Sequence, residues 1–204
     1  EDLGPSLAAL RQAGLFAVLS AYAAPVPHAR VVADAVMLLR RIGRANLSVG
    51  RLVEGHLNAH RLIALYGTPA QRAKVEAEIA AGALLGVWGA DGNPPFSYTE
   101  QGNSLVLSGS KRFASGLGLV SRAVVSVRTH QGAQLLLLSA LFCAKRMDRA
   151  AWTTSGMKAT ASGTFDFDGM VVDADARLGR PGDYARQPHF EGGVWRYAAL
   201  HVGG

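Results

Sequence analysis

The stretch YGTPAQRAKVEAEIAAGALLGVWGAD, Tyr66–Asp91, contains the change of pattern that decides the fold. A helix-ending glycine, an N-cap threonine, a proline at the first helical position and the glutamine of a capping box follow one another at Gly67, Thr68, Pro69 and Gln71. These signals predict a helix over about 69–81. From Leu84 the pattern changes to short runs of apolar and β-branched residues, separated by glycine, asparagine and proline. The chain therefore divides here into a helical part and a β part.

The residues before this stretch have helical spacing. Apolar residues recur at helical intervals in LAALRQAGLFAVLS, Leu7–Ser20. The run Ala29–Gly67 is rich in alanine and leucine and predicts one long helix or two consecutive helices. Gly43, Gly50 and Gly55 lie inside it, and each costs a helix about 1 kcal/mol relative to alanine. We therefore expect close packing or a helix break at these glycines.

The β part contains one stretch of unusually small residues. LSGSKRFASGLG, Leu107–Gly118, predicts the end of one strand, a tight turn and the start of another strand. Its second half offers little side chain, so either another backbone or a flat ligand can approach it closely. Further along, SGTFDFDGMVVD, Ser162–Asp173, alternates apolar and acidic residues and predicts a hairpin turn at Asp168–Gly169. The last segment, from Glu191, returns to helical spacing.

Composition excludes several classes of protein. The chain has 204 residues, of which 49% are hydrophobic and 18% charged, as expected for a globular protein with a core. It has no run of about 18 uncharged apolar residues and its start lacks the pattern of a signal peptide, so we expect a cytoplasmic protein without a membrane span. Its net charge is +6, but the arginines are scattered, so we expect no nucleic-acid partner. Cys143, the one cysteine, is expected to be a buried small hydrophobe.

Two histidines at helical spacing raise the possibility of a metal site. His56 and His60 lie four residues apart, which places two imidazoles on one helix face. Leu57 stands where a zinc peptidase has its catalytic glutamate, and the sequence offers no third ligand. We therefore expect packing or surface histidines and no metal.

Three motifs, in the correct order, resemble the acyl-CoA dehydrogenase family. Tyr66–Asp91 is similar to that family's capped helix and first flavin-contacting strand. LSGSKRFASG, Leu107–Gly116, resembles the strand-turn NGxKxWITN, and SGMKATASGTFDFDGMVVDADARLG, Ser155–Gly179, resembles GxRxSxTxxLxFxxVxVPxxxxLG. The resemblance covers roughly residues 45–204. It implies FAD as cofactor, an acyl-CoA or related thioester as substrate, and a homo-oligomer, either a dimer or a tetramer.

The fold that the resemblance implies is α+β. We expect an N-terminal helical domain over residues 1–83 and a small β-barrel-like domain over residues 84–190. Residues 191–204 are then the first helix of a truncated C-terminal helical domain.

The resemblance also implies site residues. Seven would contact the cofactor: Val87, Trp88, Gly89, Ala90, Phe113, Ala114 and Ser115. Four would contact the substrate: Glu191, Gly192, Gly193 and Val194. The sequence departs from the family pattern, because Phe113 replaces a tryptophan, Ser115 and Ala90 each replace a threonine, and DGNPPFSY, Asp91–Tyr98, replaces the loop EPGAGSD. These departures affect the contacts to both flavin and thioester.

The implied reaction is α,β-dehydrogenation, in which a carboxylate removes the α-proton of an acyl thioester and FAD accepts hydride from the β-carbon. One family placement of this base falls on Gly193, so Glu191, two residues earlier, is the candidate catalytic residue. The alternative role of Glu191 is a helix N-terminal carboxylate, which the helix dipole favours. Two other functions remain open for the chain: a flavin-dependent monooxygenase, which needs no such base, and a non-catalytic homologue that acts as a binding or assembly partner.

Overall fold

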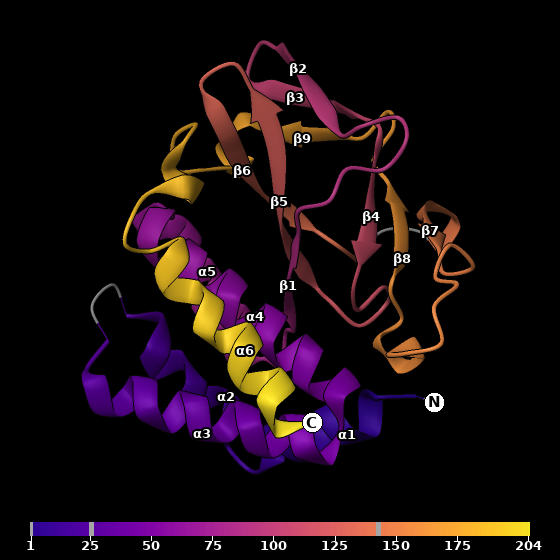
Figure 1. The fold of residues 1–204 in the computed structure, drawn as a ribbon. Helices are drawn as coiled ribbons and strands as arrows, with labels where there is room; N and C mark the ends of the chain where they lie inside the picture. The colour runs from indigo at the N-terminus through magenta and orange to yellow at the C-terminus, as the bar shows by residue number, and fades with distance from the viewer. Residues whose placement is uncertain (1, 25–26, 142–143) are drawn as a thin grey trace.

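The computed structural model describes residues 2–24, 27–141 and 144–204. Its helices are α1 (Gly4–Gln12), α2 (Leu15–Ser20), α3 (Ala29–Ala45), α4 (Leu47–Tyr66), α5 (Pro69–Ala80) and α6 (Val194–Gly203). Its strands are β1 (Leu85–Trp88), β2 (Ser97–Gln101), β3 (Ser104–Ser108), β4 (Ser110–Ala114), β5 (Arg122–Thr129), β6 (Gly132–Ser139), β7 (Met147–Asp148), β8 (Gly163–Asp166), β9 (Val171–Asp173) and β10 (Arg177–Leu178). The expected α+β order is confirmed, and Figure 1 shows the helices on one side of the molecule and the strands on the other. The prediction for Cys143 lies outside the described residues.

The capped helix that opens the deciding stretch is present. The Thr68 hydroxyl accepts a hydrogen bond from the Gln71 backbone N–H at 3.1 Å, and the Gln71 side chain accepts one from the Thr68 N–H at 2.9 Å. These two bonds satisfy donors that would have no partner in the first turn of α5. The Gln71 amide also donates to the carbonyls of Asp175 and Arg177, which attaches the start of α5 to the β part.

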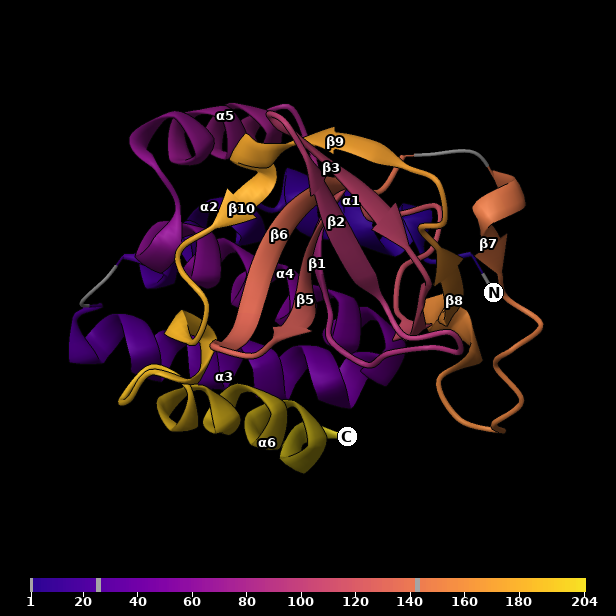
Figure 2. The same ribbon diagram turned by 90° about the horizontal axis from the view of Figure 1, so that it is seen from above.

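The long apolar run forms two helices that meet at Asn46. This residue is extended, and its side chain accepts from the Val49 N–H at 3.0 Å, which caps the start of α4. A Cβ on either Gly43 or Gly50 would lie 2.2 Å from an atom of Leu200 in α6. These glycines therefore let α6 approach α3 and α4 closely, and Figure 2 shows α6 lying along α3. The prediction of two helices and that of close packing at two of the three glycines are confirmed, whereas the break lies at Asn46 and not at a glycine, and Gly55 is not closely packed.

The strands form three small sheets. Their orders are β1-β5-β6-β10, β2-β3-β9 and β4-β8-β7, and β1 runs parallel to β5. Trp88, Phe165 and Phe167 pack against one another between them, with the Trp88 and Phe165 rings 5.2 Å apart. These buried rings make one hydrophobic core with the side chains of the helices.

The hairpin predicted at Asp168–Gly169 is wrong. The turn exists, but it passes the chain from β8, which pairs with β4, to β9, which pairs with β3. On its two sides, the N–H groups of Phe167 and Gly169 donate to the carbonyls of Gly109 and Leu107. The residues on both sides of the turn therefore hydrogen-bond to the β3–β4 segment. In a hairpin, β8 and β9 would instead pair with each other.

His56 joins α4 to the first strand. Its Nδ1 accepts a hydrogen bond from the Leu85 N–H at 3.1 Å, and its ring packs edge-to-face on Phe16 at 4.8 Å. The ring is 1% exposed, and burial, with a smaller effect of the His60 charge, lowers the pKa of His56 to about 3. His60 Nε2 lies 2.5 Å from a Glu76 carboxylate oxygen. The two histidines therefore have packing and hydrogen-bonding roles in the structure.

We predict that His56 makes the protein sensitive to acid. The unfolded chain binds a proton at this residue below its ordinary pKa of 6.5, whereas the folded chain does so only near pH 3. The free energy of unfolding should therefore fall as the pH drops from 6.5 toward 3, by up to about 1.4 kcal/mol per pH unit. Urea unfolding at a series of pH values measures this slope.

His56→Gln keeps an acceptor for the Leu85 N–H but does not titrate, so it should flatten the slope. The matched control is His130→Gln, at an exposed position beside the β5–β6 turn, which should leave the slope unchanged. Identical slopes in the wild type and His56→Gln would contradict the assignment.

Candidate functional site

The end of β1 and the strand β4 lie side by side, although more than twenty residues separate them in the chain. The Arg112 N–H donates to the Ala90 carbonyl at 3.0 Å. The indole N–H of Trp88 donates to the Ser115 carbonyl at 3.1 Å. The structure therefore brings together the two groups of residues that the sequence predicts as cofactor contacts.

The small residues of β4 are partly explained by the protein itself. Ala114 is completely buried, and a Cβ on Gly116 would lie 2.7 Å from Val120 and 3.2 Å from Leu52 of α4. Gly116 also has a φ of +78°, which favours glycine. At these two positions neighbouring groups of the protein, and not a ligand, fill the space beside the small residues.

Phe113 faces outward. The pairing of β4 with β8 shifts by one residue between Lys111 and Ala114, so Phe113 lies in a β-bulge and has a φ of 55°. Its ring is 54% exposed and meets Trp152 edge-to-face at 6.0 Å, with the Arg112 guanidinium 5.0 Å from its centre. The bulge thus presents an aromatic surface that a regular strand would turn elsewhere.

Ser115 belongs to a chain of hydroxyl groups. Its Oγ accepts from the Ser162 hydroxyl at 2.9 Å, and Ser162 Oγ lies 2.8 Å from Thr160 Oγ1. Thr160 donates in turn to the Met157 carbonyl at 2.7 Å. Because Ser115 accepts from Ser162, its own proton is left for another acceptor. Sequence reasoning missed Thr160 and Ser162 as site residues, although both lie in the third family-like motif.

The predicted β1 residues serve the site in different ways. Trp88 is 2% exposed and lies in the core, so its side chain supports Ser115 from behind. Val87 is half-buried and packs on the opposite face of the strand, against a second, smaller cluster of buried apolar side chains that includes Leu85 and Val124. Gly89 is exposed and Ala90 half-buried, and both lie at the edge that faces β4.

A buried ion pair holds this edge together. Lys111 Nζ lies 2.6 Å from Asp91 Oδ1 and donates to the Gly89 carbonyl at 2.9 Å, while its side chain is 1% exposed. Arg128 contacts the second Asp91 oxygen at 3.0 Å. Burial opposes ionisation of Asp91, but the hydrogen bonds from Lys111 and Arg128 together hold its pKa below the ordinary value. Burial lowers the pKa of Lys111, which Asp91 counteracts.

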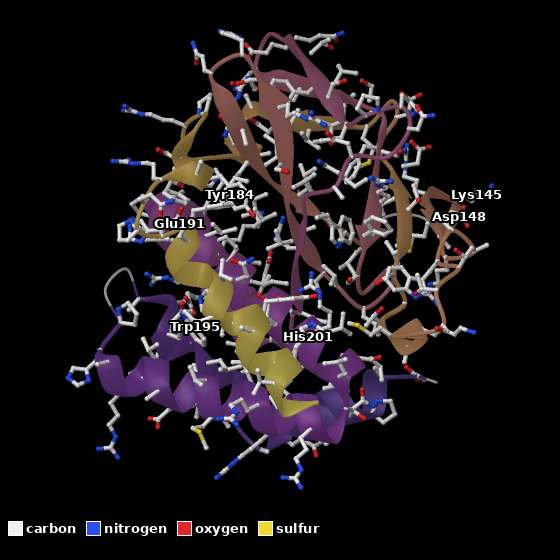
Figure 3. The ribbon with its side chains drawn as sticks, in the orientation of Figure 1. Lys145, Asp148, Tyr184, Glu191, Trp195 and His201 are labelled. Carbon is white, nitrogen blue, oxygen red and sulfur yellow. The ribbon has the colours of Figure 1, made fainter. Side chains whose placement is uncertain are left out.

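The predicted substrate residues lie elsewhere, at the start of α6. Glu191 and Gly193 bound a short helix, η6 (Glu191–Gly193), and Figure 3 shows Glu191 near Tyr184 at this end of α6. Glu191 is exposed and Val194 is 63% exposed. Gly193 is buried, and a Cβ there would lie 2.6 Å from Nη2 of Arg196. The guanidinium of Arg196 therefore occupies the space into which a side chain at position 193 would project.

The described ranges contain neither a metal-binding cluster nor a single helix that could cross a membrane. Within them, no group of three or more His, Cys, Asp and Glu side chains is arranged to hold a metal ion. No single helix there is long and apolar enough to cross a membrane, and only the bent pair Gly4–Gln12 and Leu15–Ala23 together has that length and composition.

Solved structures resemble this chain. FMN-bound TdsC from Paenibacillus sp. A11-2 matches 83% of the chain at 24% identity with a TM-score of 0.65. Butyryl-CoA dehydrogenase from Megasphaera elsdenii matches 82% at 17% identity with a TM-score of 0.68. A glutaryl-CoA dehydrogenase from Mycobacterium smegmatis in complex with FADH2 matches 82% at 16% identity with a TM-score of 0.67. The chain spans 47%, 48% and 46% of these proteins. No protein-family model and no curated protein matches the sequence.

We predict that Asp91→Asn destabilises the fold strongly. The change leaves the buried Lys111 ammonium without its counter-charge, which should lower the free energy of unfolding by about 3–5 kcal/mol. Lys111→Met should cost less, because it removes the buried charge and leaves Asp91 paired with Arg128.

Denaturant unfolding of both variants measures these losses. Arg128→Met is the control, since that side chain is 87% exposed and its ion pair should contribute about 1 kcal/mol at most. Equal losses in Asp91→Asn and Arg128→Met would show that the Lys111–Asp91 pair does not hold the β1–β4 edge.

Proposed function

We propose that this chain, whose helical and β parts have the acyl-CoA dehydrogenase fold, forms the flavin-contacting portion of an oxidoreductase. The observation that carries the proposal is that the exposed Phe113 and the half-buried Ser115, at the end of β4, lie beside the segment that contains Gly89 and Ala90. These residues fit a flat, polar-edged ring. Phe113 offers an aromatic surface, Ser115 retains a proton to donate, and Gly89 has no side chain to obstruct approach.

When bound, the flavin would supply the redox chemistry by accepting or releasing hydride and electrons. The chain's own residues would position it. Ser115 would donate a hydrogen bond, while Ser162 and Trp88 hold Ser115 in place. We propose FAD, as the resemblance implies, with FMN as the alternative, because one similar protein was solved with FMN and another with FADH2.

We propose an acyl-CoA or related thioester as the substrate and α,β-dehydrogenation as the reaction. Removal of the α-proton needs a carboxylate, and Glu191 is the candidate that residues 191–194 offer. Glu191 is exposed to solvent at the start of α6. We also expect a homo-oligomer and a cytoplasmic location, as proposed from the sequence.

A second candidate is flavin-dependent monooxygenation, and one observation favours it. The base position of the family's first-helix placement is Gly193, which packs against the guanidinium of Arg196. A reaction that inserts oxygen needs no α-proton base there. TdsC, solved in one structure as a dibenzothiophene monooxygenase, shows that this fold also occurs in such an enzyme.

We predict that the purified protein takes up flavin and that Ser115→Tyr prevents it. The phenol ring would fill the surface beside Phe113 that the isoalloxazine needs. Absorption at roughly 370 and 450 nm after incubation with FAD or FMN and gel filtration measures uptake, and chromatography of the released flavin identifies it.

The matched control is Ser97→Tyr, at an exposed position on β2, which should bind flavin like the wild type. Circular dichroism verifies that each variant is folded. Equal flavin content in Ser115→Tyr and the wild type would reject the site. If none of the proteins took up flavin, the proposed flavin function would be rejected and a non-catalytic role would be favoured.

We predict that one assay on the flavin-loaded protein distinguishes dehydrogenation from monooxygenation. If it is a dehydrogenase, anaerobic butyryl-CoA should bleach the absorption at roughly 450 nm, and Glu191→Gln should slow this by about 10²–10⁴-fold. If it is a monooxygenase, butyryl-CoA should have no effect, and reduced flavin with oxygen should add one oxygen atom to indole or dibenzothiophene, detected by mass spectrometry. Bleaching that is unchanged in Glu191→Gln would exclude Glu191 as the base.

A further inference from the structure

A small pocket lies between α4, the start of α6 and the short helix η5 (Asp183–Ala185). Its volume is about 200 Å³, below the range of about 300–1,000 Å³ for sites of drug-sized ligands. The polar side chains that line it are those of Glu54, Asn58, Tyr66, Tyr184, His189, Arg196 and Tyr197. Figure 3 shows Tyr184 at this end of α6. The pocket therefore suits a small polar molecule or one polar end of a larger one.

Arg196 is buried in the wall of this pocket with part of its hydrogen-bonding capacity unused. Its side chain is 8% exposed. Nη1 donates to the Tyr22 hydroxyl at 3.1 Å, and Nη2 donates to the Asn58 amide oxygen at 2.8 Å. Within the described part of the chain Nε is buried and has no hydrogen-bond partner, although it forms an ion pair with a Glu54 oxygen 3.7 Å away. A guanidinium has five N–H donors, so Arg196 can bind a further acceptor.

Tyr66 adds a second unsatisfied group to the same wall. Its hydroxyl is buried and has no hydrogen-bond partner among the described residues. Burial raises the pKa values of Tyr66 and Tyr184, so both phenols stay protonated and can donate. Buried polar groups in native proteins usually have partners, because leaving one without a partner is unfavourable. These donors thus point to a missing acceptor.

The charge around the pocket favours an acceptor that is negative. One buried carboxylate, that of Glu54, lies between two guanidiniums, because it contacts Arg51 as well as Arg196. Burial lowers the pKa of Arg61, and the positive charge of nearby Arg196 lowers it further. Asp183, whose charge also acts on Tyr66, is paired with Arg186, so guanidiniums outnumber carboxylates here. Gly193 is part of the arrangement, since any larger residue would push the Arg196 guanidinium out of position.

We propose that this pocket binds the carboxylate group of a small organic acid. Arg196 Nε and the Tyr66 hydroxyl donate to the carboxylate oxygens, and Glu54 is neutralised by Arg51, so it does not repel the ligand. The proposal needs no flavin, so its failure and the failure of the proposed redox function are separate results.

The test measures binding of propionate to the purified, flavin-free protein by calorimetry and thermal unfolding. Propionamide, the uncharged analogue of the same shape, is titrated in parallel at equal ionic strength in a carboxylate-free buffer. We expect saturable binding of propionate with a rise in Tm, and no binding of propionamide. Absence of propionate binding, or equal binding of the two compounds, would overturn the proposal.

Variants locate the binding. Tyr66→Phe removes only an unpartnered hydroxyl, so it should leave stability unchanged or slightly raised, yet weaken propionate binding by about tenfold. Arg196→Met should abolish binding, and Gly193→Ala should weaken it by displacing the guanidinium. The control Tyr98→Phe, on β2 and outside the pocket lining, should bind like the wild type. Unchanged affinity in both Tyr66→Phe and Gly193→Ala would show that propionate binds elsewhere and would overturn the proposal.

Discussion

The arrangement of the β part depends on the interactions of the buried Lys111 ammonium. Its three partners are the Asp91 carboxylate, the Gly89 carbonyl and the face of the Phe96 ring, 5.5 Å away. Removing such a charge from water is costly, and these partners offset part of that cost. Because Asp91 and Gly89 follow β1 while Lys111 lies in β4, the ion pair sets the position of one strand against the other. The outward position of Phe113 adds a second constraint, the bulge in the pairing of β4 with β8.

The helical part depends on a different constraint, the close approach of α6. Gly43 and Gly50 admit Leu200, and Gly203 lies so near α3 that a Cβ there would be 2.0 Å from the Arg40 carbonyl oxygen. With α6 held this closely, Arg196 is enclosed between α4 and Tyr22. A carboxylate side chain at position 193 would overlap with the Arg196 guanidinium, so the two cannot both be present. The same packing that closes the helical part therefore bears on which reaction the fold can support.

Local patterns in the sequence correctly predicted features that depend on residues close together in the chain. The capping box at Thr68 depends on residues within a few positions, so its pattern is legible without the fold. The path of the chain at Asp168–Gly169 was predicted wrongly because its partners, Leu107 and Gly109, lie about sixty residues away. The bulge at Phe113 and the burial of Arg196 likewise depend on distant contacts. The resemblance supplied the strand residues of the candidate site, whereas Thr160 and Ser162 became visible only when the fold placed them beside Ser115.

Backbone strain gathers around this hydroxyl chain. Phe113, Met157 and Ala161 have φ values of 55°, 55° and 48°, a region that costs a non-glycine residue roughly 1–2 kcal/mol. Met157 supplies the carbonyl that Thr160 binds, and the Ala161 carbonyl accepts from the Leu117 N–H. A strand pinch alone would need small residues at Ala114 and Gly116 but would not need three strained neighbours. Strain of this kind persists where surrounding contacts hold it and is concentrated at functional sites, so it favours a bound ligand at Phe113 and Ser115 over simple packing.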